Sequence, residues 1–180
     1  MNLRAHIELM ASYNAWMNRK LYAAAATLPA EALTADRGAF FGSILGTLNH
    51  LVVGDTIWLQ RFALHPSGST VLEPVVALPT PRTLDETVCA DLPSLSQRRQ
   101  LLDDAIEAWA GGLADADLDQ TLHYRSTRGV PGAKVFGALI MHFFNHQTHH
   151  RGQITTLLTQ AGAEVGVTDL LMLIPDPPAT

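Results

Sequence analysis

The sequence has little that would tie it to a disulfide scaffold, a membrane or a nucleic acid. Its single cysteine, Cys89, excludes an internal disulfide. It carries 12 Lys and Arg against 17 Asp and Glu, a net charge of -5, whereas nucleic-acid binding needs clustered cations. No run reaches the roughly 18 apolar residues of a membrane span, since even residues 135–158 contain four histidines and an arginine. We therefore expect no nucleic-acid partner and no membrane association.

The remaining composition is that of an ordinary globular protein. Its 180 residues, 47% of them hydrophobic, fit one domain spanning residues 1–180. Charge appears by Arg4 with no apolar stretch of a signal peptide, so we expect a cytoplasmic protein. No glycine-rich phosphate loop and no nucleophile elbow occurs in the sequence.

Four segments repeat apolar residues with helical periodicity, which predicts an all-α fold, a four-helix bundle. They cover about residues 3–28, 43–64, 94–113 and 134–160. Ser43 is a candidate N-cap of the second helix, and Gly162 is a candidate stop for the fourth. Each predicted helix therefore has a recognisable end signal or a proline nearby.

The segments between these helices are irregular. Residues 66–93 contain five prolines and predict a long connection with one helical turn near residues 84–88. Such a long connection suits a crossover between parallel helices. We also expect residues 121–126 to pair weakly with the turn-rich residues 129–132, and the apolar tail, residues 169–174, to dock on the bundle.

Histidines gather in the fourth helix, where four of the eight lie within nine positions. At about 100° per residue, His146 and His150 project to the centre of the buried face, His142 and His149 to its edge, and Arg151 to the far side. Imidazoles one turn apart can share one metal ion, but two ligands rarely suffice.

The second helix offers a third ligand, His50. Gly46 and Gly54 share its stripe, and each costs roughly 1 kcal/mol relative to alanine in a helix. That cost indicates that room is kept, either for the imidazole and its ion or for a closely approaching helix. Gln147 stands where the zinc proteases with two histidines at this spacing have a glutamate, so that mechanism is not expected.

Other candidates are weaker. A lone histidine is most often a hydrogen-bonded structural residue, which is the interpretation we give His6, His65 and His123. Asp103, Asp104 and Glu107 form a charged stripe that we expect to be solvated. The sequence leaves open whether a fourth ligand comes from His142, His149 or Asp55, or from none of them.

At this point the chain resembles the DinB family over nearly its whole length. The resemblance rests on three motifs: Tyr13-Asn14-Ala15-Trp16-Met17-Asn18, Ser43 to His50 with Asp55 and Trp58, and Asn145-His146-Gln147-Thr148-His149-His150-Arg151-Gly152-Gln153-Ile154. It implies an up-down-down-up four-helix bundle with a long crossover between helices 2 and 3. It also implies a divalent ion, zinc or nickel, held by His50, His146 and His150, and a homodimer.

Three functions follow as hypotheses. The family resembles bacillithiol transferases and mycothiol-dependent maleylpyruvate isomerases, so the first is a metal-dependent transferase or isomerase that uses a low-molecular-weight thiol and a small-molecule substrate. The second is a metal-dependent hydrolase, in which the ion lowers the pKa of bound water. The third is a non-catalytic metal-binding protein of the stress response, which a closed fourth ligand would favour.

Overall fold

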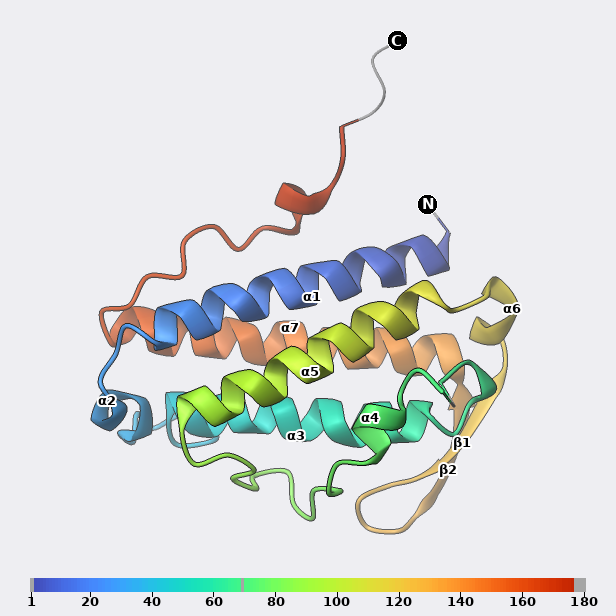
Figure 1. Cartoon of the computed structure of the whole chain (residues 1–180), viewed down its shortest axis with the longest axis horizontal. Coiled ribbons are helices and arrows are strands. Elements are labelled where there is room, and N and C mark those ends of the chain that lie inside the picture. The colour runs from blue at the N-terminus through green and yellow to red at the C-terminus, as the bar shows by residue number, and fades with distance from the viewer. Residues whose placement is uncertain (1, 69, 177–180) are drawn as a thin grey trace.

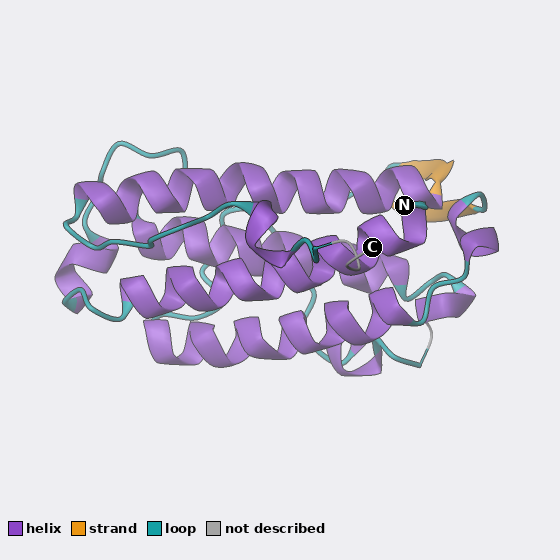
Figure 2. Cartoon of the chain, turned by 90° about the horizontal axis from the view of Figure 1, so that it is seen from above, coloured by secondary structure: helices purple, strands orange, loops and turns teal. Residues whose placement is uncertain are grey.

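The computed structural model describes residues 2–68 and 70–176 and is mostly helical, with one two-stranded sheet. The long helices are α1 (Leu3–Ala25), α3 (Ile44–Phe62), α5 (Leu92–Gly111) and α7 (Phe136–Gln160). They lie side by side along the long axis of the molecule (Figures 1 and 2). Helices α1 and α3 each pack against both α5 and α7, so the four helices enclose a common core.

The ends of these helices follow local chemistry. The Ser43 hydroxyl accepts a hydrogen bond from the Gly46 N–H (3.0 Å), which confirms the predicted N-cap of α3. Gly162 has a φ of 85°, a conformation that favours glycine, and it ends α7 as predicted. Helix α1 ends at Ala25, earlier than expected, and α7 begins at Phe136, two residues late.

Several short helices were not predicted. They are α2 (Ala30–Thr34), η1 (Pro66–Gly68), α4 (Glu73–Val76), α6 (Asp115–Leu118) and η2 (Leu170–Leu173). The helical turn expected at residues 84–88 is wrong: residues 84–85 form a turn without a helix, and the α-helical turn of this connection is α4. The reason is burial: Leu72 and Val75 are fully buried, whereas Leu84 is 51% exposed.

A hairpin closes one end of the molecule (Figure 1). Strands β1 (Thr121–Arg125) and β2 (Pro131–Val135) pair antiparallel from Thr121↔Val135 to Arg125↔Pro131. The predicted pairing is therefore present and continues to the start of α7. Tyr124 brings its ring to 5.6 Å from that of Trp58, so the hairpin covers part of α3.

The C-terminal tail lies along α1, where the Tyr13 hydroxyl donates to the Thr168 carbonyl oxygen (2.7 Å). The expectation that its apolar residues dock holds only in part, because η2 has no buried residue and Leu171 is 72% exposed. Among the described residues, no helix combines the length and apolar character needed to cross a membrane.

Candidate metal centre

Three histidines from two facing helices meet at one point. Helix α3 supplies His50, and α7 supplies His146 and His150, one turn apart. The Nε2 atom of His50 lies 3.1 Å from that of His146 and 3.1 Å from that of His150. All three donor atoms fall within 4.8 Å of one another, a group that could hold a metal ion. The structure thus brings together the residues that the sequence proposed.

Hydrogen bonds at the far ring nitrogens fix the tautomers. The Nδ1–H of His50 donates to the Leu84 carbonyl oxygen, and the Nδ1–H of His150 donates to Oε1 of Gln153, each at 2.7 Å. A carbonyl oxygen can only accept, so each Nδ1 carries the proton and each Nε2 of a neutral ring presents a lone pair. Two lone pairs therefore face each other across 3.1 Å.

The rings are neutral near pH 7. Burial, and then the neighbouring imidazoles, lower the pKa of His146 to about 3. Burial also lowers the pKa of His50 and His150. With no proton between them, the Nε2 atoms of His50 and His150 repel one another, and a shared cation relieves that repulsion. Nitrogen ligands about 2.0 Å from a tetrahedral zinc ion are separated by about 3.3 Å, so the observed spacing fits a divalent ion.

Small residues and one aromatic ring shape the site. A Cβ on Gly54 would lie 2.9 Å from Cε1 of His146, so this glycine keeps room for the imidazole, as one of the two sequence interpretations held. At Gly46 a Cβ would lie 2.2 Å from the Phe41 carbonyl oxygen. That glycine instead admits the preceding loop, whose Phe41 ring stacks on His50 at 3.8 Å between centroids.

A buried polar network lies behind the histidines, and it corrects two expectations. Asp103 is 3% exposed, not solvated: it forms an ion pair with Arg99 (3.1 Å) and accepts hydrogen bonds from Asn14 and Asn18. Arg151 does not point away from the core. It is 2% exposed and donates to the Asn14 side chain.

Asp55 belongs to this network and not to the histidine cluster. Its side chain is fully buried, with one carboxylate oxygen bound by Arg99 and the other by the Gln147 amide (2.7 Å). Both oxygens are therefore occupied by donors, which removes Asp55 as a fourth ligand.

The other two candidates for a fourth ligand also lie outside the group of converging atoms. His142 is exposed, with its ring centroid 6.3 Å from that of His146, and it packs on Trp58. His149 is exposed and contacts the Gln153 amide (3.3 Å). Of the lone histidines, His65 is a hydrogen-bonded core residue as expected, contacting Ser67 and Gln120.

A cleft of about 330 Å³ opens beside the histidines. His50, His146, Trp58 and Arg61 line it, together with residues of the hairpin. The cluster is consequently not sealed in the core, and a small molecule in the cleft would lie against His50 and His146. Phe41, Leu84 and Gln153 complete the site without having been predicted. Of these three residues, only Gln153 could have been found from the sequence, because it lies one helical turn after His150.

Comparison with known proteins identifies relatives of the chain. The family model for the DinB family matches residues 1–176. The chain belongs to the DinB family. Protein DinB of Bacillus subtilis (strain 168) is 27% identical over 158 residues, which cover 87% of each chain. No solved structure gives a significant match to the chain.

Proposed function

We propose that this DinB-family protein binds one divalent metal ion, zinc or nickel, through His50, His146 and His150, and that it is a metal-dependent enzyme acting on a small molecule. One observation carries the proposal. The Nε2 atoms of His50 and His150 lie 3.1 Å apart although both rings direct their Nδ1–H elsewhere. A cation is the partner that this arrangement of acceptors fits.

The proposal includes a bundle of up-down-down-up order, in which α3 and α5 run parallel. It is supported by the colour gradient of Figure 1, where both helices run from left to right, and by the long connection between them. In this order two antiparallel neighbours, α3 and α7, supply the ligands, and the loop with Phe41 and the connection with Leu84 both reach His50.

The chemistry that we propose is that of a thiol-dependent transferase or isomerase. A bound divalent ion would supply Lewis-acid chemistry, which favours the deprotonated form of a thiol or water near it. The chain's own residues orient the imidazoles through Leu84 and Gln153 and hold Phe41 over the ring of His50. An enzymatic role, as opposed to a stress-response metal protein without turnover, is supported by the cleft at the histidines.

Metal content measured by mass spectrometry on untagged protein tests the proposal. We expect about one zinc or nickel ion per chain, and sharply lower occupancy in each of His50→Ala, His146→Ala and His150→Ala. His123→Ala is the matched control, because that histidine is exposed on β1. Full occupancy in the His50→Ala variant would contradict the ligand set.

The thiol step has a separate test. In the cobalt-substituted protein, a thiol that binds through sulfur should add an intense near-ultraviolet charge-transfer band. If bacillithiol, mycothiol, glutathione and cysteine all leave the spectrum unchanged at millimolar concentration, the thiol route fails, and a hydrolase or a non-catalytic protein takes its place.

A further inference from the structure

One stripe of α3 connects the histidine cluster to an arginine. Arg61 follows His50 by eleven positions, and at about 100° per residue this amounts to three turns plus roughly 20°. Gly54, Ile57 and Trp58 lie between them on the same side, and all five residues line the cleft beside the histidines. One end of the cleft is therefore lined by His50, a candidate metal ligand, and the other end by the cationic side chain of Arg61.

The guanidinium of Arg61 is half-buried, and no acidic residue that the structure describes pairs with it. It packs on the rings of Trp58 (4.6 Å to the centroid) and Tyr124 (5.3 Å). Among the described residues it takes part in no ion pair. Arg99 differs from Arg61 in this respect, because it is also buried but forms ion pairs with Asp55 and Asp103. A desolvated cation with no counter-ion is costly unless a ligand provides one.

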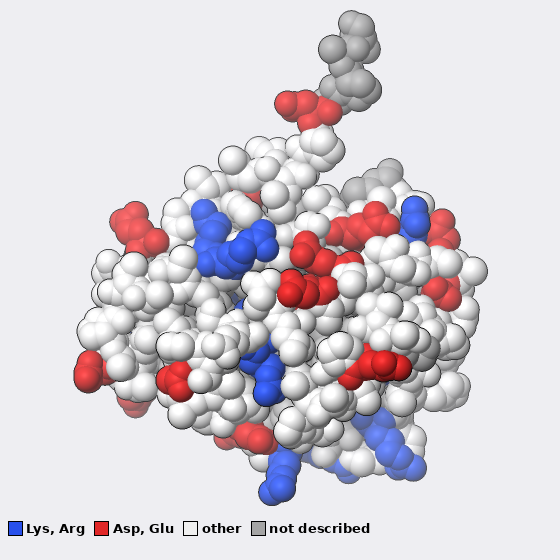
Figure 3. Space-filling model, viewed as in Figure 1, with Lys and Arg blue, Asp and Glu red and all other residues white. Residues whose placement is uncertain are grey.

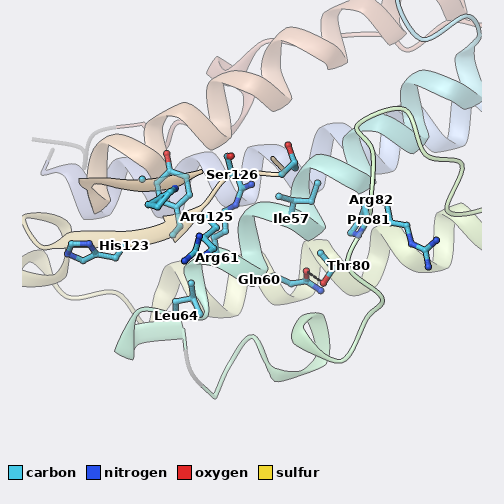
Figure 4. A pocket seen from close by; sticks show the side chains of 14 residues that line it. Ile57, Gln60, Arg61, Leu64, Thr80, Pro81, Arg82, His123, Arg125 and Ser126 are labelled. Carbon is cyan, nitrogen blue, oxygen red and sulfur yellow. Dashed lines mark hydrogen bonds between the residues drawn. The ribbon is translucent and has the colours of Figure 1, made fainter. Parts of the chain in front are cut away.

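Arg61 also borders a second cavity, of about 900 Å³, whose lining residues are shown in Figure 4. Arg61 and Tyr124 line both cavities, as do Ser126 and Thr127, and Arg125 joins the wall in the second. Arg82 lines the second cavity as well, but in this view it extends away from Arg61.

No carboxylate lines either cavity among the described residues. The net charge of the chain is nevertheless -5, and acidic side chains are spread over the surface shown in Figure 3. The positive lining is therefore local, and it would attract an anion to this cleft rather than to the protein as a whole.

We propose that the cleft binds a small molecule with an anionic group, a carboxylate or a phosphate, which Arg61 holds while the other end of the molecule reaches the histidine cluster. This inference rests on the proposed function and adds the class of ligand. Arg61 provides a fork of donors suited to either anion. The rings of Trp58 and Tyr124 hold the guanidinium in place and offer an apolar wall to the middle of the ligand.

The helix sets the length of that ligand. Eleven residues rise about 16 Å along the axis. The Arg61 guanidinium, however, packs over Trp58, and the histidine cluster lies between the levels of His50 and Gly54, where a Cβ would meet His146. Four to eight residues separate these levels, a rise of about 6–12 Å. The two ends of the ligand are therefore on the order of 10 Å apart.

A pair of probes that differ only in charge tests the inference on the cobalt-substituted protein. 8-Mercaptooctanoate spans about this length, and 8-mercaptooctan-1-ol is its neutral match. We expect the acid to bind about tenfold more tightly than the alcohol, as one charge-assisted pair would give. Arg61→Gln should abolish this preference and leave the affinity for the alcohol unchanged, and Arg61→Lys should restore part of it. 3-Mercaptopropionate is too short to span the cleft, so it should bind the parent protein and the Arg61→Gln variant with equal affinity.

Arg128→Gln is the charge control, because Arg128 is exposed on the same hairpin but lines neither cavity. Loss of the preference in that variant, or its survival in Arg61→Gln, would overturn the proposal. If no thiol perturbs the cobalt spectrum, the thiol chemistry fails, and the anion site is then decided on metal-free protein by calorimetry with octanoate and octan-1-ol. In this measurement the parent chain should bind octanoate more tightly than octan-1-ol, and Arg61→Gln must remove that difference. Equal binding of the two ligands by the parent chain refutes the site. Octyl phosphate in place of octanoate distinguishes a phosphate from a carboxylate ligand.

Discussion

Replacing Gly54 by alanine should separate the stability of the fold from the affinity for metal. The added Cβ would lie 2.9 Å from Cε1 of His146. Carbon atoms in ordinary contact are about 3.5–4.0 Å apart, so the ring must move by about 0.6–1 Å. His146 is only half-buried and borders the cleft, so it has space to move without disturbing the core.

The two effects of this substitution have opposite signs. Metal–ligand distances tolerate only about 0.2 Å, so the displaced ring should lower metal affinity by about 10–100-fold, as loss of supporting contacts does. Alanine also removes the cost of a glycine inside a helix, which is about 1 kcal/mol. We therefore expect the metal-free variant to be as stable as the parent chain or slightly more stable.

Competition with a chromophoric chelator measures the affinity, and urea unfolding in excess chelator measures the stability. Gly152→Ala is the control, because a Cβ there meets nothing within 4 Å and lies on the other ligand helix, α7. It should gain stability and keep its metal affinity. Zinc affinity within twofold of the parent in Gly54→Ala would refute the steric reasoning.

Four further outcomes are expected. Asp55→Ala should lower the free energy of unfolding by about 3 kcal/mol or more in urea titrations, because it leaves the buried Arg99 short of a partner. Chelation should lower the melting temperature reversibly while circular dichroism stays helical, because the core does not depend on the ion. The metal-free protein should lose stability as pH falls from about 6.5 toward 3, since burial lowers the pKa of His146 to about 3 in the folded state and the unfolded chain takes up the proton first; acid titration by circular dichroism checks this. Light scattering should give a dimer mass, and a monomer mass would contradict the expected homodimer.

Periodicity was sufficient to predict the long helices and the convergence of the histidines. His146 and His150 are one turn apart on an apolar face, and His50 lies between two glycines on another, so the pattern alone indicated facing ligands. Helices α2 and α4 have five and four residues, too few to repeat a helical period. Their positions depend instead on single buried side chains such as Leu33 and Val75.

The sequence did not predict which charged side chains are buried, and the reason is a different one. Asp103 and Asp104 are neighbours on α5, yet only Asp103 is buried, because Arg99, Asn14 and Asn18 satisfy it. Those partners include two side chains of α1, which lies far away in sequence. Whether a charge is solvated is therefore settled by its tertiary neighbours, and the local pattern carries no information about them.

The network and the histidine cluster are two consequences of how α7 is rotated about its axis. His146 is followed by Gln147 and His150 by Arg151, and adjacent helical residues point about 100° apart. Gln147 reaches Asp55, and Arg151 reaches Asn14, both inside the bundle. With those two side chains held, His146 and His150 can only face His50 and the cleft. The buried charges thus stabilise one rotation of α7, and the geometry of the histidine cluster depends on contacts that lie outside the cluster.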